Sequence, residues 1–184
     1  MLDKIIALDK ELFVYLNGLG SSIYDGFWLI ITQQAYWIPF FLFLAYLLFK
    51  KMGLKNLGIV VLFISVLILC CDSSVEFFKS TFHRLRPCND PDIKAVIRIV
   101  HQSDTYSFFS GHASNSMATM LFLFLILKKY YKYSYLIFLY PLLFAYSRIY
   151  LGVHFPIDII TGYVFGALFG ITFYAIYKKY ILKN

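Results

Sequence analysis

Five long apolar segments constrain this chain most strongly. They lie at about residues 27–49, 56–78, 112–128, 133–150 and 156–177. A helix needs about 20 predominantly apolar residues to cross the hydrocarbon core of a bilayer. Only 15% of the residues are charged, whereas soluble domains carry about 25%. The sequence therefore predicts an all-α, polytopic membrane helical bundle with about five transmembrane helices, formed as a single domain over residues 1–184.

An amphipathic segment precedes these spans. Residues 2–19 place five apolar side chains on one helical face at steps of three and four: Ile5, Leu8, Leu12, Leu16 and Leu19. Charged residues lie largely opposite, although Asp9 falls within the apolar face. The segment is too charged to span a bilayer and is typical of a helix lying in the membrane interface. It brings the expected number of helices to six.

Lysines predict the orientation of the bundle. With five spans, one side carries nine lysines and no carboxylate: Lys50, Lys51, Lys55, Lys128, Lys129, Lys132, Lys178, Lys179 and Lys183. The positive-inside rule makes this the cytoplasmic face. All ten carboxylates fall on the opposite side or in the segments leading to it, together with the loop at about 79–111 and the turn between the last two spans.

That last turn carries three residues suited to phosphate chemistry. Arg148 can hold a phosphate through two parallel hydrogen bonds. His154 can act as a nucleophile or a proton carrier near neutral pH. Asp158 would share a helix face with His154 and hold its ring in one tautomer. Such a trio is a weak signal alone, so its meaning depends on the rest of the chain.

Two further segments supply matching groups. Lys79 and Arg86, at the start of the 79–111 loop, offer cations, although basic side chains at helix ends also snorkel to the interface. Ser110, Gly111 and His112 open the third span. A helix N-terminus with a serine cap and a glycine favours bound anions, although this is equally an ordinary cap beside an interfacial histidine.

Together these residues form a set for phosphoryl transfer without a metal. Lys79, Arg86 and Arg148 would stabilise charge on the phosphoryl oxygens. One histidine would attack phosphorus, and the other would protonate the departing alkoxide. The spacing of His, Cys, Asp and Glu shows no convincing metal cluster, so we expect no metal and no cofactor.

The pattern Lys79-x6-Arg86-Pro87, Ser110-Gly111-His112 and Ser147-Arg148-x5-His154-x3-Asp158 resembles the three-part signature of the type 2 phosphatidic acid phosphatase (PAP2) superfamily. The resemblance covers residues 79–158 and extends to the five-span layout of small bacterial members. It implies that His154 is a nucleophile forming a phosphohistidine, with Asp158 as its orienting partner. It also implies that His112 is the acid for the leaving group, and that the other five residues cradle the phosphate: Lys79, Arg86, Ser110, Gly111 and Arg148.

One position departs from the family pattern. Phe109 stands where a proline usually precedes Ser-Gly-His. A proline there would stiffen the entry to the helix, so its loss bears on the geometry of the loop but on no catalytic group.

The resulting hypothesis is a phosphatase of the bacterial inner membrane whose site faces the periplasm or the cell exterior. It would hydrolyse a phosphomonoester or a terminal pyrophosphate of a lipid. Undecaprenyl pyrophosphate, phosphatidylglycerophosphate, phosphatidate and a lipid A phosphate all fit the same cradle. The alternatives are a lipid phosphotransferase using the same phosphohistidine and a non-enzymatic lipid carrier. We expect membrane lipid and no nucleic acid as partners, and the sequence leaves the oligomeric state open.

The remaining polar residues are assigned structural roles. His83 and Arg84 are expected on the solvated or headgroup-facing surface. Asp72 and Glu76 are expected to pair with Lys79 or a neighbouring cation, and Asn115 to bond between helices. Five charged loop residues are expected in solvent, with contact to the lipid headgroup as the alternative: Asp90, Asp92, Lys94, Arg98 and Asp104. Cys88 is expected to be a lone loop thiol.

Overall fold

The computed structural model describes residues 1–181, which form helices joined by turns and one long loop. In chain order the elements are α1 (Leu2–Gly18), η1 (Ser22–Tyr24), α2 (Asp25–Ile31), η2 (Gln34–Trp37), α3 (Ile38–Phe82), η3 (Pro87–Asn89), α4 (Gly111–Leu127), η4 (Ser134–Phe138), α5 (Leu139–Tyr150) and α6 (Pro156–Tyr180). The elements labelled η are short 3-10 helices.

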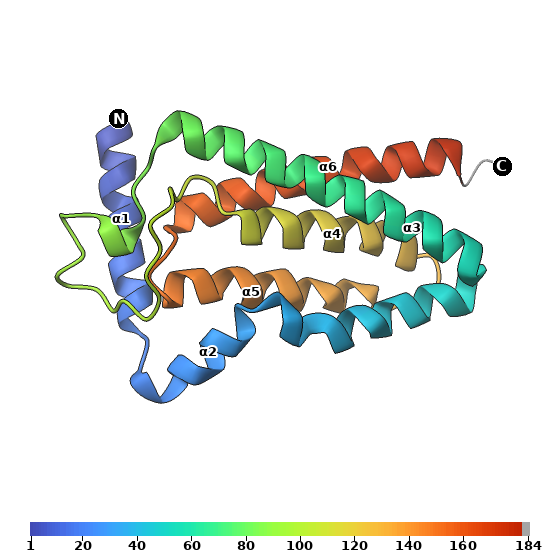
Figure 1. Cartoon of the computed structure of the whole chain (residues 1–184), viewed down its shortest axis with the longest axis horizontal. Helices are drawn as coiled ribbons and strands as arrows, with labels where there is room; N and C mark the ends of the chain where they lie inside the picture. The colour runs from blue at the N-terminus through green and yellow to red at the C-terminus, as the bar shows by residue number, and fades with distance from the viewer. Residues whose placement is uncertain (182–184) are drawn as a thin grey trace.

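α3 is a helical hairpin rather than one straight helix. It reverses at Gly53, whose φ of 76° is a conformation that side-chain-bearing residues rarely adopt. Residues 38–52 lead away from the amino-terminal end, and residues 54–82 return toward it, diverging from the first limb with distance from the turn (Figure 1). The two limbs of α3 therefore correspond to the first two predicted spans.

The five predicted apolar segments fold as helices: the two limbs of α3, α4, α5 with its leading η4, and α6 (Figure 1). By length and hydropathy, Gln34–Asn89 and Pro156–Tyr180 can cross a membrane, with mean hydropathies of 2.5 and 1.8. The predicted start of the first span at residue 27 was wrong. Gln33 has extended backbone, so α2 ends before η2 and does not continue into α3.

The predicted amphipathic helix is α1, which crosses the end of the bundle at a steep angle to the spans (Figure 1). Its apolar face is exposed, as an interfacial helix requires, with Leu8 at 62%. Its buried face is Asp9, Phe13 and Asn17, one turn apart. Asp9 therefore faces the protein, and the expectation that it interrupts the lipid-facing side was wrong.

Three glycines let α6 lie directly on α4. Gly162, Gly166 and Gly170 repeat every four residues along α6. A Cβ at these positions would lie 2.7, 2.4 and 2.8 Å from the carbonyl oxygens of Ser110, Ser114 and Ala118, respectively. Small residues at such spacing allow membrane helices to approach closely. The contact sets the amino-terminal ends of α4 and α6 side by side.

Replacing Gly166 with alanine should therefore destabilise the protein by about 1–3 kcal/mol, because the added methyl group overlaps backbone rather than a flexible side chain. Gly58, in α3, is the matched control, since a Cβ there meets nothing within 4 Å. Gly58→Ala should leave stability unchanged or raise it slightly. Thermal unfolding in detergent measures both. Equal stability of the two variants would contradict this account of the α4–α6 contact.

Candidate active site

The predicted residues gather around one cavity of about 340 Å³ at the end of the bundle crossed by α1. Six of the eight line it: Lys79, Arg86, Gly111, His112, Arg148 and His154. The other two, Ser110 and Asp158, are fully buried. They come from α3, α4, α5, α6 and the intervening loops, so only the folded bundle brings them together.

The amino-terminal end of α4 forms one wall of the cavity. Ser110 caps the helix, and its hydroxyl accepts a hydrogen bond from the Ala113 N–H at 3.4 Å. The Ser110 N–H donates to the carbonyl of Asp158 at 3.0 Å, which ties this end to α6. His112 lies one position inside the helix, and its ring stacks on Phe144 with 4.8 Å between centroids.

His154 sits in the tight turn between α5 and α6. Gly152 has a φ of 85°, and a Cβ there would lie 2.9 Å from the carbonyl oxygen of Arg98, so the turn requires glycine. The N–H groups of Val153 and His154 both donate to the carbonyl of Arg148, at 3.0 and 3.3 Å. The His154 side chain is only 2% exposed.

The contacts of the His154 ring define its tautomer. Nε2 lies 3.3 Å from Nη1 of Arg86, and a guanidinium can only donate. Nε2 must therefore carry a lone pair, which assigns the proton to Nδ1. Nδ1 lies 3.5 Å from Oδ2 of Asp158. The Nε2 lone pair of the neutral ring thus lies beside Arg86, and both residues line the cavity.

The surroundings of His154 also favour its neutral form. Burial lowers the pKa of His154 well below its usual range, and the positive charges of Arg86, Arg148 and Lys79 act in the same direction. Burial likewise lowers the pKa of Arg86.

Arg86 and Arg148 are held differently. Arg86 donates to the Thr105 and Val153 carbonyls and to the Thr105 hydroxyl, at 2.8–3.0 Å, so it also ties the loop to the site. Arg148 is 7% exposed and donates through Nη1 to the hydroxyl of Thr32 at 2.5 Å. Within residues 1–181 its Nε has no hydrogen-bond partner. Arg148 therefore retains a donor for an anion.

Arg84 was missed by the sequence analysis, which placed it on the solvated surface. Its guanidinium bonds to both Asp158 and Asp9, at 2.7 and 2.6 Å, and its side chain is 22% exposed. That expectation was wrong because Asp9, on the buried face of α1, supplies a second carboxylate. His83, one residue earlier, is exposed as expected.

Asp72 and Asn115 bond between helices. The Asn115 amide donates to Asp72 at 2.7 Å, which confirms the expected interhelical bond of Asn115. Among the described residues no ion pair joins Asp72 or Glu76 to Lys79, so that expected pairing was wrong. Both carboxylates instead line the cavity, together with Gln34.

The long loop is anchored rather than free in solvent. Arg98 pairs with Asp25 at 2.8 Å, and Lys10 pairs with Asp90 and Asp92 at 2.8 and 2.7 Å. The expectation that Arg98 and Asp90 are simply solvated was therefore wrong, because α1 and α2 bring counter-charges to them. Cys88 is a free thiol, as expected, but it is 4% exposed and packs inside the loop.

Phe109 stabilises the entry to α4 at the position where the family usually has a proline. The ring is fully buried and stacks on Phe165 at 4.7 Å, with Phe78 edge-on at 5.2 Å. Aromatic packing against α3 and α6 therefore holds the entry to α4 where a proline would have restricted the backbone.

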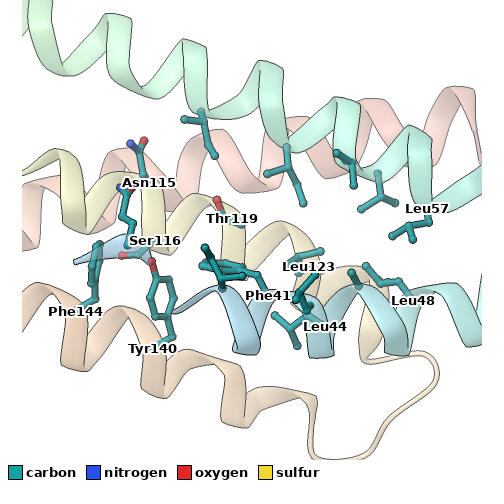
Figure 2. Close-up of a pocket in the computed structure, with 18 of the residues that line it drawn as sticks. Phe41, Leu44, Leu48, Leu57, Asn115, Ser116, Thr119, Leu123, Tyr140 and Phe144 are labelled. Carbon is teal, nitrogen blue, oxygen red and sulfur yellow. The ribbon is translucent and has the colours of Figure 1, made fainter. Parts of the chain in front are cut away.

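An apolar groove of about 510 Å³ adjoins the polar cavity. Both are lined by Gln34, Asp72 and Asn115. Figure 2 shows Asn115 and Phe144 at one end of the groove and Leu48 and Leu57 at the other. The groove therefore runs along the bundle, between the α3 hairpin, α4 and α5, away from the histidines.

No group of three or more His, Cys, Asp or Glu side chains suited to holding a metal ion occurs in the part of the chain that the structure describes. The charged groups lining the cavity include three cations, Lys79, Arg86 and Arg148, which suit an anion. Metal independence stays a prediction for experiment.

A helical bundle with apolar, membrane-length helices and a cation-lined cavity beside two histidines is the arrangement expected of a membrane protein that acts on a phosphate-bearing molecule. Comparison with known families agrees. The model of the PAP2 superfamily matches residues 57–182. The chain belongs to the PAP2 superfamily.

Two bacterial relatives align over almost the whole chain. A lipid A 4'-phosphatase of Porphyromonas gingivalis is 34% identical over 98% of this chain and 76% of its own length. A lipid A 4'-phosphatase of Bacteroides thetaiotaomicron is 30% identical over 97% of this chain and 81% of its own length. These relatives match beyond the three signature segments.

Solved structures share the fold. The transmembrane PAP2-type phosphatidylglycerolphosphate phosphatase of Bacillus subtilis superimposes with a TM-score of 0.73 at 18% identity, covering 96% of this chain and 88% of that one. Aquifex aeolicus LpxE gives a TM-score of 0.65 at 25% identity, covering 89% and 92%. The fold of this chain is that of a PAP2 membrane protein.

Proposed function

We propose that this protein is a PAP2-type lipid phosphatase that works through a phosphohistidine on His154. The observation that carries the proposal is the neutral imidazole of His154, held with its Nε2 lone pair beside Arg86 in a cavity lined by cations. A nucleophile needs such a lone pair, and a transferring phosphoryl group needs such positive charge. Family membership supports the same chemistry.

The reaction divides into two steps. In the first, Nε2 of His154 attacks phosphorus while the bond from phosphorus to the lipid oxygen breaks, and His112 gives its proton to the departing oxygen. In the second, His112 takes a proton from water, whose oxygen attacks phosphorus, and the bond from phosphorus to His154 breaks. Inorganic phosphate leaves, and both histidines regain their starting states.

The remaining site residues hold the phosphoryl group. Lys79, Arg86 and Arg148 would stabilise charge on its outer oxygens, with the free Nε of Arg148 as one donor. The Ser110 hydroxyl and the Gly111 N–H, at the amino-terminal end of α4, would donate further hydrogen bonds to the phosphoryl oxygens. Asp158 would keep the Nδ1 proton of His154 in place. No step needs a metal ion.

The apolar groove supports a lipid as substrate. It begins beside the polar cavity at Asp72 and Asn115 and is lined mainly by aliphatic and aromatic side chains. We infer that an acyl chain lies in the groove while its phosphate lies among the cations. A lipid A phosphomonoester is the first candidate, because the two relatives at 30% identity or more are lipid A 4'-phosphatases.

Charge supports an outward-facing site in a bacterial inner membrane. The eight described lysines of the predicted cytoplasmic face lie at the turn of the α3 hairpin, just after α4, or in the last turn of α6, at the end opposite the cavity (Figure 1). Lys183 lies outside the described residues. By the positive-inside rule this end faces the cytoplasm, and the cavity then opens toward the periplasm or the cell exterior.

His154→Ala should abolish phosphate release from a lipid A phosphomonoester, by roughly a thousandfold or more, because the nucleophile is lost. His112→Ala should cost about 10²–10⁴-fold through loss of the proton donor. The assay measures inorganic phosphate from purified protein in EDTA, with Cys88→Ser as a control outside the mechanism.

Retained turnover in folded His154→Ala would overturn the nucleophile. Loss of wild-type turnover in EDTA, restored by a divalent metal, would overturn metal independence. Phosphate appearing on an acceptor lipid instead of in solution would make the protein a phosphotransferase. No phosphate release from any of the four candidate lipids would favour a carrier.

The rate should be bell-shaped in pH. Protonation of His154 removes its lone pair, so activity falls on the acid side as the pH drops through its pKa. Because burial and three cations lower that pKa, the acid limb of kcat/KM should lie below the ordinary histidine value of about 6.5. The alkaline limb should belong to His112 and change in His112→Gln.

The pKa of the substrate phosphate, measured by phosphorus NMR, is the control for that profile. An acid limb that shifts with the substrate pKa would belong to the substrate phosphate and contradict the assignment to His154. An acid limb that stays constant when the substrate pKa is changed would support that assignment. An acid limb at or above pH 6.5 would contradict the lowered pKa of His154.

A bulky side chain in the groove should slow turnover of a lipid with long acyl chains more than turnover of a phosphomonoester without them. Ala45 lines the groove, so Ala45→Phe should lower turnover of a long-chain lipid about tenfold. Hydrolysis of a water-soluble phosphomonoester should change little. Ala175, exposed on α6, is the matched control, and Ala175→Phe should affect neither substrate. Equal losses on both substrates would contradict an acyl chain in the groove.

A further inference from the structure

One arginine connects the interfacial helix to the catalytic turn. Arg84 donates through Nη1 to Oδ1 of Asp158 at 2.7 Å and through Nη2 to Oδ2 of Asp9 at 2.6 Å. Asp158 is fully buried, and Asp9 is 3% exposed. A planar guanidinium can hold two carboxylates in fixed directions, which an ammonium cannot do equally well.

Both carboxylates are fixed on their other sides as well. The second oxygen of Asp158 accepts from the Phe155 N–H at 2.9 Å and lies 3.5 Å from Nδ1 of His154. The second oxygen of Asp9 accepts from the Ile157 N–H at 2.9 Å. The Arg84 guanidinium lies over the ring of Phe155, 4.2 Å from its centroid. Each contact touches the segment that follows His154.

These contacts form a continuous line from α1 through Arg84 and Asp158 to the ring of His154. Asp158 would be a buried carboxylate without a cation if Arg84 were absent, and such a group is costly. Arg84 therefore compensates the charge of Asp158 and orients its carboxylate, and Asp9 keeps Arg84 in place.

We propose that Arg84 and Asp9 are positioning residues for the reaction, and that through them α1 forms part of the catalytic apparatus. The inference rests on the proposed role of His154 as nucleophile. Neither residue lines the cavity, so both act through Asp158 and not on the substrate.

The pH profile separates this role from a merely structural one. The charged and titratable groups around His154 are Asp158 from α6, Arg86 from the loop, Arg148 from α5, Lys79 from α3 and His112 from α4. Loss of the Arg84 cation leaves the Asp158 charge uncompensated. Negative charge stabilises the imidazolium, so the pKa of His154 should rise.

Arg84→Gln should therefore lower kcat about tenfold or more with KM changed less than about twofold, because no substrate contact is lost. It should also move the acid limb of kcat/KM upward by about one pH unit. Arg84→Lys retains the charge without the two-pronged geometry. It should return the acid limb toward the wild-type position while recovering kcat only in part.

Asp9→Asn is the second variant, in case Arg84→Gln does not fold. An asparagine oxygen can still accept from the Ile157 N–H, so the fold should persist while Arg84 loses one anchor. Its kcat should fall by a few fold at constant KM. In the double variant Asp9→Asn/Arg84→Lys, the reductions in kcat of the two single variants should not add, because both residues act through Asp158.

Arg98→Gln is the matched control. Arg98 also bridges a loop to an amino-terminal element, through Asp25 at 2.8 Å, but it does not contact Asp158. It should leave the acid limb unmoved whatever its effect on thermal stability. An Arg84→Gln or Asp9→Asn protein with wild-type kcat, or an acid limb unmoved in Arg84→Gln, would overturn the proposal. Absence of turnover in the wild type would instead overturn the proposed function.

Discussion

The close contact between α4 and α6 is the interaction on which the rest of the structure depends. Three glycines remove the side chains that would otherwise separate the helices, and carbonyl oxygens of the α4 segment occupy that space. Because the contact reaches Ser110, the helix end carrying His112 is held beside the turn carrying His154. In a bilayer, where apolar burial does not distinguish lipid from protein, such direct packing decides how helices associate.

Charge at the active end is arranged in two layers. Cations and a neutral imidazole line the cavity, where a phosphate can offset them. Behind them, carboxylates are paired with cations that do not line the cavity, as in Asp9 and Asp158 with Arg84. The separation places Asp158 3.5 Å from His154 Nδ1 while keeping Asp9 and Asp158 out of the cavity in which we propose that the phosphate binds. Asp72 and Glu76 are exceptions, since they line the cavity where it meets the groove.

The interfacial helix has two faces with different tasks. Its exposed apolar side suits the membrane surface. Its buried side inserts Asp9 and Asn17 among the loops of the site, where the Asn17 amide donates to the carbonyls of Arg98, Ile149 and Tyr150. A helix suited to the membrane interface therefore also holds the loops surrounding the proposed nucleophile.

Sequence alone determined the helical membrane class, the approximate spans and the grouping of the eight site residues on one side. Each of these follows from local or periodic properties: apolar length, lysine distribution and residues at fixed spacing. The tertiary structure alone decided the partners of Arg84, Asp9 and Arg98, because each depends on charges more than 70 positions away in the chain. It also decided the tautomer of His154 and the course of the groove, since both arise from side chains that only packing brings together.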